Sequence, residues 1–272
     1  MTAFFFKHFS IEHDHSTMKV GTDGVLLGAW ASLPEKSDAR NLSLSSRDAL
    51  PGTAKRFLDV GCGCGLISLM MAQRLGMMGW KPWEARVDAM DLDVASCEEA
   101  SSNAGNSSYR EYVSVFHSDY RQLPAYFRPG SYCRIVSNPP YFQDSLKCPG
   151  KQRNQARHTD TLPFEDLVSV SERLLEPAGR LCLILPPSSM ECVQRLMPAY
   201  APSLELRRLA QVFSKPGKVC GRVMAEWGRR EDGEVRASHP LLPVCHDILL
   251  HDEAGTYTEE YRNLVKDFYL WA

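Results

Sequence analysis

From residue 56 onward, short apolar or β-branched runs alternate with longer helical segments, and this alternation limits the fold more than any other feature. The predicted strands are 56–60, 87–92, 112–117, 132–137 and 180–185, and the predicted helices are 66–75, 94–104 and 164–175. Such alternation is typical of βαβ units on a parallel sheet. Two further strands, 204–213 and 219–227, flank a Lys-Pro-Gly turn and predict an antiparallel hairpin at one edge. We expect an α/β, doubly wound fold with a mostly parallel, seven-stranded sheet.

The residues before the first of these strands divide into two parts. Residues 18–33 predict a turn and a short apolar helix, with Thr22 or Asp23 as its N-cap. Residues 34–53 are polar and Ser-rich, which predicts a mobile linker or surface loop. We therefore expect an N-terminal segment at 1–33, a linker at 34–53 and the main domain at 54–272.

A glycine-rich turn follows the first strand of the alternating region. Gly61, Gly63 and Gly65 follow Asp59 in a G-x-G-x-G spacing, which is shorter than the dinucleotide-binding G-x-G-x-x-G. Missing side chains let a ligand approach the backbone at a helix N-terminus. Asp59 disfavours a pyrophosphate there and suits a cationic or ammonium-bearing ligand. The alternative is a tight strand-to-helix turn that binds nothing.

Acidic residues also end the next two strands. Asp91 lies where doubly wound folds place the acid that accepts hydrogen bonds from ribose hydroxyls. Asp119 follows the third strand and can accept a hydrogen bond from an adenine amine, although such an Asp is often only a turn residue. Together with Asp59, these acids favour a bound adenosine at the carboxyl edge of the sheet.

An Asn-Pro-Pro-Tyr segment follows the fourth strand. Asn138 precedes two prolines, Pro139 and Pro140, which stiffen the chain and remove two N–H donors, and Tyr141 and Phe142 come next. The Asn oxygen and a proline-adjacent carbonyl can hold both hydrogens of a planar NH₂ group, while Tyr141 stacks on a flat ring. A delocalised amine is a poor nucleophile, so orienting it out of water towards an activated methyl group is the catalysis that it needs.

These motifs together resemble the class I S-adenosylmethionine-dependent amino-methyltransferases. Segments 6–11, 18–30, 156–159 and 267–270 further resemble the bacterial tRNA1(Val) adenine-N6 methyltransferase family. The resemblance implies a Rossmann-like fold and S-adenosylmethionine as cofactor, with contacts from Lys19 and Asp23 besides the residues above. It also implies methyl transfer to the N6 amine of an adenine beside the anticodon of a valine tRNA. Cys62 and Cys64 in the turn, and the 34–53 insert, depart from the family pattern.

Two basic segments are candidates for contact with RNA. The first, 147–158, contains no acid and directly follows the Asn-Pro-Pro-Tyr segment. We expect it to contact phosphates on either side of an extruded adenine. Its predicted RNA-binding residues, with Phe142, are Lys147, Lys151, Arg153, Arg157 and His158. The second, 207–222, is as well explained by a solvated face.

Composition excludes several other classes of protein. The chain has 31 Lys and Arg against 33 Asp and Glu, so any nucleic acid must be held by a local patch rather than by global charge. Nine Cys without a C-x-x-C spacing argue against disulfides and structural zinc, and we do not assign His13 and His15 to a metal site. No apolar stretch approaches the roughly 20 residues of a membrane span. We expect a cytoplasmic protein, without a metal and monomeric.

Two alternative functions remain open from the sequence. The same Asn-Pro-Pro-Tyr motif recognises a glutamine amide in the methyltransferases of release factors, but those proteins carry a longer helical N-terminal domain. The second alternative is a non-catalytic adaptor that binds RNA or cofactor without reacting.

Overall fold

The computed structural model describes residues 3–36, 54–140, 162–230 and 243–272. An eight-stranded sheet has the order β10-β8-β9-β7-β6-β3-β4-β5, and β1 and β2 form a separate small sheet. The strands are β1 (Ala3–Phe5), β2 (Ser10–Glu12), β3 (Lys55–Val60), β4 (Ala85–Asp91), β5 (Val113–His117), β6 (Tyr132–Ser137), β7 (Leu175–Leu185), β8 (Leu204–Phe213), β9 (Arg222–Arg229) and β10 (Val244–Leu249). The helices are α1 (Thr22–Trp30), α2 (Leu66–Met77), α3 (Val94–Gly105), α4 (Phe164–Leu174), α5 (Pro187–Tyr200) and α6 (Glu259–Val265).

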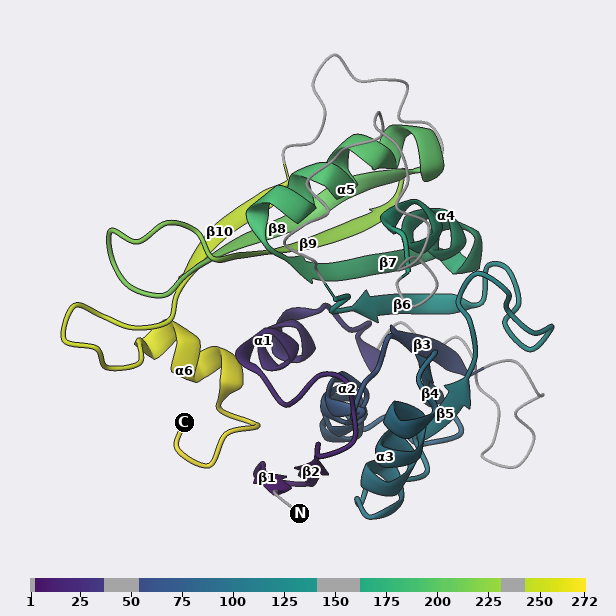
Figure 1. The fold of residues 1–272 in the computed structure, drawn as a ribbon, viewed down its shortest axis with the longest axis horizontal. Coiled ribbons are helices and arrows are strands. Elements are labelled where there is room, and N and C mark those ends of the chain that lie inside the picture. Colours follow the sequence, from purple (N-terminus) through teal and green to yellow (C-terminus); the bar gives the residue numbers. More distant parts are fainter. Residues whose placement is uncertain (1–2, 37–53, 141–161, 231–242) are drawn as a thin grey trace.

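Helices cover both faces of the large sheet. The helices α1, α2 and α3 lie on one face, and α4 and α5 lie on the other (Figure 1). Phe57 and Leu58 are neighbours in β3, yet they belong to hydrophobic clusters on opposite faces. Because helices shield both faces of the sheet from water, the central strands are continuous apolar runs, which is typical of parallel sheets.

The predicted α/β alternation is confirmed. Strands β5, β4, β3, β6 and β7, in this spatial order, pair in parallel with one another. The predicted hairpin is also present, because β9 is antiparallel to both β8 and β7. Its turn is closed by a hydrogen bond from Lys218 N to Lys215 O (3.2 Å), and Gly217 takes a φ of 70° there.

The sheet differs from the prediction at its edge. Strand β10 pairs in parallel with β8, so the sheet has eight strands and the hairpin does not form its edge. The prediction of seven strands was wrong because β10, an outer strand with mostly exposed side chains, was not recognised.

Two helices also correct the sequence reading. Helix α5 was not predicted, although Met190, Val193 and Met197 form a buried stripe at helical spacing and Pro187 stands at its first position, where proline is favoured. The N-cap of α1 is Gly21 and makes no side-chain cap, so the assignment to Thr22 or Asp23 was wrong.

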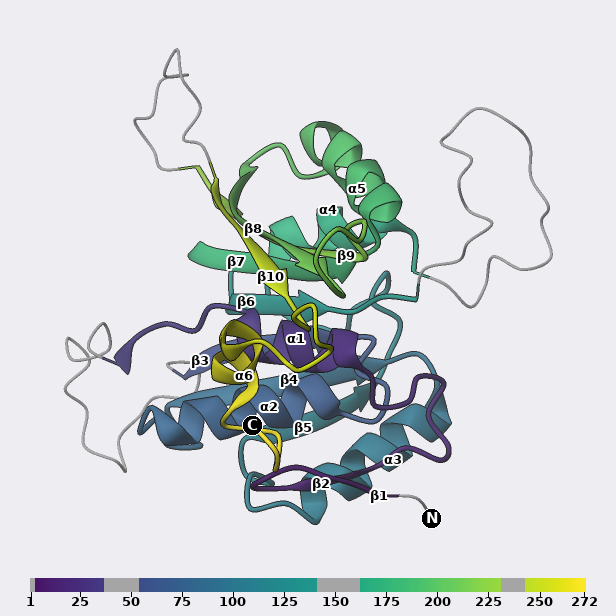
Figure 2. The ribbon, with the colours of Figure 1, turned by 90° about the vertical axis from the view of Figure 1, so that its left-hand side faces the viewer.

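The N-terminal residues share the core of the main sheet. Phe6, Phe9 and Ile11 are buried in the same cluster as α1 and α2. The Phe6 ring stacks on Tyr269 at 5.7 Å, so the two ends of the chain meet. Figure 2 shows the β1–β2 pair beside α3 and close to the C-terminal segment. The boundaries drawn at 33 and 53 remain predictions.

Candidate active site

The glycine turn between β3 and α2 is fixed by its neighbour β4. Gly61, Gly63 and Gly65 take φ values of 71°, 52° and 81°, a region that side chains disfavour. The N–H groups of Gly61 and Cys62 both donate to Met90 O, at 2.8 and 2.9 Å. These amides are therefore occupied within the protein, which supports the expectation that the turn is not a pyrophosphate cradle.

Asp91 is the last residue of β4, as predicted, and its carboxylate supports the same turn. One oxygen accepts from Gly63 N (2.8 Å) and the other from Asp93 N (2.9 Å). Asp93 is occupied as the N-cap of α3, where it accepts from Ser96 N at 2.8 Å. Each Asp91 oxygen keeps a second lone pair, so the carboxylate can still accept from a ribose hydroxyl.

Asp59 is fully buried at the end of β3. Its Oδ2 accepts from the backbone N (3.0 Å) and Oγ (2.7 Å) of Ser68, so it satisfies a free amide in the first turn of α2. Its Oδ1 is buried and has no hydrogen-bond partner within the described residues. Burial raises the pKa of Asp59 to about 7, although the Ser68 bonds act to lower it. A buried carboxylate with one unsatisfied oxygen favours a nearby cation.

Asn138 follows β6 and lies beside the glycine turn. Ser137 Oγ donates to Val60 O (2.7 Å), which joins the ends of β6 and β3. Asn138 Oδ1 is buried without a hydrogen-bond partner in the part of the chain that the structure describes. Pro139 is buried and Pro140 is exposed, while Tyr141 and Phe142 lie outside the described residues. The end of β6 thus presents an amide oxygen that receives no hydrogen bond from residues 3–36, 54–140, 162–230 or 243–272.

A cavity of about 240 Å³ lies between the glycine turn and Asn138. Its walls come from the start of α1 and the segment before it, from the turn and the start of α2, and from the end of β6. Among the lining residues are Met18, Lys19, Asp23, Gly61, Gly63 and Asn138. Five predicted site residues from three distant parts of the chain therefore line one space, whereas the predicted residues Asp59, Gly65 and Asp91 are not among its lining residues.

The N-terminal wall of this cavity is attached to α3. Glu99 accepts hydrogen bonds from the backbone N–H groups of His15 (2.9 Å) and Ser16 (2.8 Å). Asn103 bonds both polar backbone atoms of Glu12 and also donates to Cys64 O in the turn (2.9 Å). Glu99 and Asn103 were not predicted as part of the site. Their spacing of four residues, which places them on one face of α3 beside the apolar Ala100, is the one feature of the sequence that indicates a shared role.

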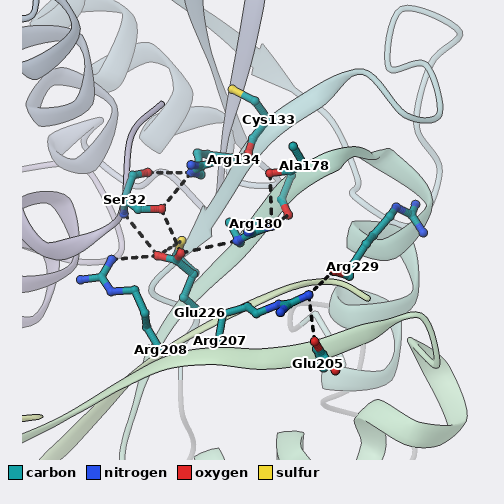
Figure 3. Close-up of polar contacts among 12 residues, drawn as sticks. Ser32, Cys133, Arg134, Ala178, Arg180, Glu205, Arg207, Arg208, Glu226 and Arg229 are labelled. Atoms are coloured by element: carbon teal, nitrogen blue, oxygen red, sulfur yellow. Dashed lines mark hydrogen bonds and ion pairs between the residues drawn. The ribbon is translucent and has the colours of Figure 1, made fainter. Parts of the chain in front are cut away.

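A second attachment holds the residues that follow α1. Ser32 Oγ donates to the buried carboxylate of Glu226 (2.9 Å), and Arg134 Nε donates to Ser32 O (2.7 Å) (Figure 3). Arg208 pairs with Glu226 at 3.1 Å and lies 4.3 Å from the centre of the Trp30 ring. The cations at Ser32 also face the carboxyl end of α1, where its dipole is negative.

Asp23 and Asp119 have ionic partners. Asp23 in the first turn of α1 pairs with Arg222 at the start of β9 (2.6 Å), which brings the β8–β9 turn to the cavity. Asp119 pairs with Arg121 (2.6 Å), and the hydrogen bonds from that guanidinium hold the pKa of Asp119 below its usual value. Asp119 does not line the cavity, so contact with an adenine amine remains a prediction with Arg121 as competitor.

The structure describes only the second of the two basic segments proposed to contact RNA. The residues predicted to bind RNA, Lys147, Lys151, Arg153, Arg157 and His158, lie outside the described residues. In the second run, Arg207 and Arg208 turn towards Glu205 and Glu226 (Figure 3). Only the turn of that run exposes cations.

Comparison with known proteins gives the family. Residues 43–196 match the model of the methyltransferase small domain. A tRNA1(Val) (adenine(37)-N6)-methyltransferase of Phocaeicola vulgatus is 38% identical over 267 residues, covering 98% of this chain and 97% of the relative. One of the same name from Porphyromonas gingivalis is 35% identical over 98% of this chain and 94% of its own length.

The chain belongs to the tRNA1(Val) (adenine(37)-N6)-methyltransferase family. Solved structures support the fold of a class I methyltransferase. A predicted O-methyltransferase from Agrobacterium tumefaciens superposes with a TM-score of 0.58 at 16% identity, covering 90% of this chain and 96% of that one. The Thermus thermophilus 16S rRNA N2 G1207 methyltransferase gives 0.51 at 18% identity, covering 84% of this chain and 50% of that one. The predicted Rossmann-like fold and the resemblance are thereby confirmed.

The site fits the methyl donor that the family resemblance implies. The unsatisfied Asp59 oxygen suits an ammonium group, Lys19 in the cavity suits a carboxylate, and Asp91 suits a ribose. At Gly61 a side chain would meet no atom within 4 Å, which leaves open space for a ligand beside the backbone.

The described residues also bear on metal binding and membrane insertion. Across residues 3–36, 54–140, 162–230 and 243–272, no group of three His, Cys, Asp or Glu side chains is arranged to hold a metal ion. The helices in these ranges include none with the length and apolar character that a membrane span needs.

Proposed function

We propose that this protein transfers a methyl group from S-adenosylmethionine to the N6 amine of an adenine in the anticodon loop of tRNA, next to the anticodon, with tRNA1(Val) as substrate. The observation that carries the proposal is the buried Oδ1 of Asn138 at the wall of the cavity, which has no hydrogen-bond partner among the described residues. The names of the relatives, which match across almost the whole chain, supply the acceptor.

Asn138 orients the acceptor. The lone pair of an adenine amine is delocalised into the ring, so the amine must be held in line with the methyl group and away from water. Asn138 Oδ1 accepts one amine hydrogen and stabilises the positive charge that grows on nitrogen during attack. No base is needed beforehand, because the amine loses its proton after the transfer.

The neighbours of Asn138 shape the acceptor pocket. Pro139 and Pro140 hold the chain stiff and contribute carbonyl acceptors without competing N–H donors. Tyr141 stacks on the adenine ring, and Phe142 contacts the RNA beside it.

The chain holds the donor from three sides, and the bound donor supplies an electrophilic methyl group. Asp59 pairs with its ammonium group and Lys19 with its carboxylate, while Asp91 accepts from its ribose. Asp119 approaches the adenine, and Asp23 supports the wall that carries Lys19. Pairing with a cation lowers the pKa of Asp59 from about 7, so donor binding favours the ionised carboxylate.

The RNA is held beside the cavity. We assign its phosphates to Lys147, Lys151, Arg153, Arg157 and His158, which follow the Asn-Pro-Pro-Tyr segment in the sequence. An anticodon loop offers unstacked bases, which is how RNA-modifying proteins read sequence. The enzyme acts as a monomer in the cytoplasm.

Labelled methyl donor and a tRNA1(Val) transcript test the proposal. Asn138→Ala should lower the rate by about 100-fold or more, because it removes a transition-state hydrogen bond, and should leave donor binding intact. Asn106→Ala, at an exposed Asn at the end of α3, is the matched control and should keep full activity. Transfer that persists in Asn138→Ala, or label found only on protein, contradicts the proposal.

The alternatives are separated in the same assay. The glutamine reading is not favoured, because the relatives that match 98% of this chain bear the adenine name. A release-factor peptide offered in place of tRNA should take up no label. Donor binding without turnover on any RNA supports the adaptor instead.

A further inference from the structure

A histidine side chain joins the two ends of the segment between β2 and α1. His13 Nδ1 accepts a hydrogen bond from the backbone N–H of Val20 at 2.8 Å. A backbone N–H can only donate, so Nδ1 carries no proton and the ring is neutral, with its proton on Nε2. The bond spans the residues that carry Met18 and Lys19 to the cavity wall.

This segment rests directly on the glycine turn. A side-chain atom placed on Gly63 would lie 3.7 Å from Met18 O. Within the segment, Ser16 Oγ donates to Met18 O at 3.0 Å, and Thr17 N donates to Ser96 Oγ of α3 at 3.4 Å. Any change in the path of residues 13–20 therefore moves one wall of the cavity.

We propose that His13 is a positioning residue for the methyl donor: its neutral ring holds Val20, and through it Met18 and Lys19, in the shape that binds S-adenosylmethionine. Protonation turns Nδ1 from an acceptor into a donor that faces the Val20 N–H, which breaks the bond and opens the wall. The inference rests on the proposed use of S-adenosylmethionine.

Several other charged groups lie near His13. Glu12, Asp14, His15 and Lys19 lie on the same segment, and Glu99 faces it from α3. Burial acts to raise the pKa of Glu99, but the N–H donors from the segment outweigh it and hold the pKa below its usual value. Glu99 is thus ionised between pH 5.5 and pH 8.

A pair of variants isolates the Nδ1 atom. His13→Asn places a carbonyl oxygen near the position of Nδ1 and keeps the acceptor without titrating. His13→Ala removes the acceptor. His15→Ala is the matched control, because the His15 ring is exposed while its backbone N–H, which Glu99 binds, is kept.

The measurement is the Kd of S-adenosylmethionine by calorimetry between pH 5.5 and 8. From pH 8 to pH 5.5, wild-type affinity should fall more than that of His13→Asn, because only the wild-type side chain can take up a proton at Nδ1. The comparison with His13→Asn subtracts the titration of Asp59, which both proteins share. His13→Ala should bind about tenfold or more weakly at pH 8, with a raised KM for the donor and an unchanged kcat, while His15→Ala should match wild type.

Several results would overturn the inference. Equal pH dependence of wild type and His13→Asn would do so, as would wild-type affinity in His13→Ala, or a His13→Asn variant that is folded by circular dichroism yet as weak as His13→Ala. In each of these cases the wild-type protein still binds the donor, and the proposed function stands. If wild type binds no S-adenosylmethionine at any pH, the proposed function fails and the inference fails with it.

Discussion

Replacing Asp59 with Asn should change how the stability of this protein depends on pH. Asp59 is fully buried, and burial raises its pKa from an ordinary 3.8 to about 7. The folded protein therefore keeps a proton that the unfolded chain loses between these two values. A carboxyl with a raised folded pKa contributes most below pH 3.8, and its contribution falls as the pH rises to about 7.

The size of the effect follows from the shift. One pKa unit corresponds to about 1.4 kcal/mol, so a shift of roughly three units amounts to about 4 kcal/mol in total. Of this, about 2–3 kcal/mol falls between pH 5 and pH 8. The amide side chain of the Asp59→Asn variant would keep an acceptor for Ser68 but has no proton to lose, so the variant lacks this slope.

Urea unfolding of both proteins without ligand, at pH 5, 6, 7 and 8, measures the difference. The free energy of unfolding of Asp59→Asn minus that of wild type should rise by about 2–3 kcal/mol from pH 5 to pH 8. Asp119→Asn is the control, because the pKa of Asp119 is held below its usual value and the group is ionised in both states throughout this range. A difference for Asp59→Asn that is as flat as that of the control would refute the reasoning.

Three further predictions concern packing, charge and RNA. A Cβ on Gly28 would lie 2.7 Å from Met70 Sδ, so Gly28→Ala should lower the free energy of unfolding by about 1–3 kcal/mol in urea melts, and the double variant with Met70→Ala should lose less than the sum of the two single losses. Glu226→Gln removes the carboxylate that pairs with Arg208 and should lower the free energy of unfolding by about 1–3 kcal/mol. An unchanged melting temperature in thermal melts would contradict a stabilising role for this ion pair. Binding of tRNA should weaken with salt, and neutralising Lys147, Lys151, Arg153 and Arg157 together should flatten that slope in filter-binding titrations, whereas an unchanged slope removes the segment from the interface.

Several features were missed because they have only a weak local signal. Strand β10 carries mostly exposed side chains, and its place is set by pairing with β8. The anchor of the N-terminal segment joins Asn103 to Glu12, 91 positions apart, and Glu226 meets Ser32 across 194 positions. Such contacts depend on how the elements come together, and a short window of sequence does not contain them.

By itself, the sequence determined the alternation of strands and helices, the glycine turn after β3, and the placing of Asp91 and Asn138 at the ends of their strands. These are local properties, because apolar periodicity, missing side chains and prolines act within a few residues. Only the tertiary structure decided that Lys19, Gly63 and Asn138 share one cavity, and that α3 and His13 shape its N-terminal wall. The physical reason is that parallel strands bring their carboxyl ends to one edge, while long-range hydrogen bonds choose what covers that edge.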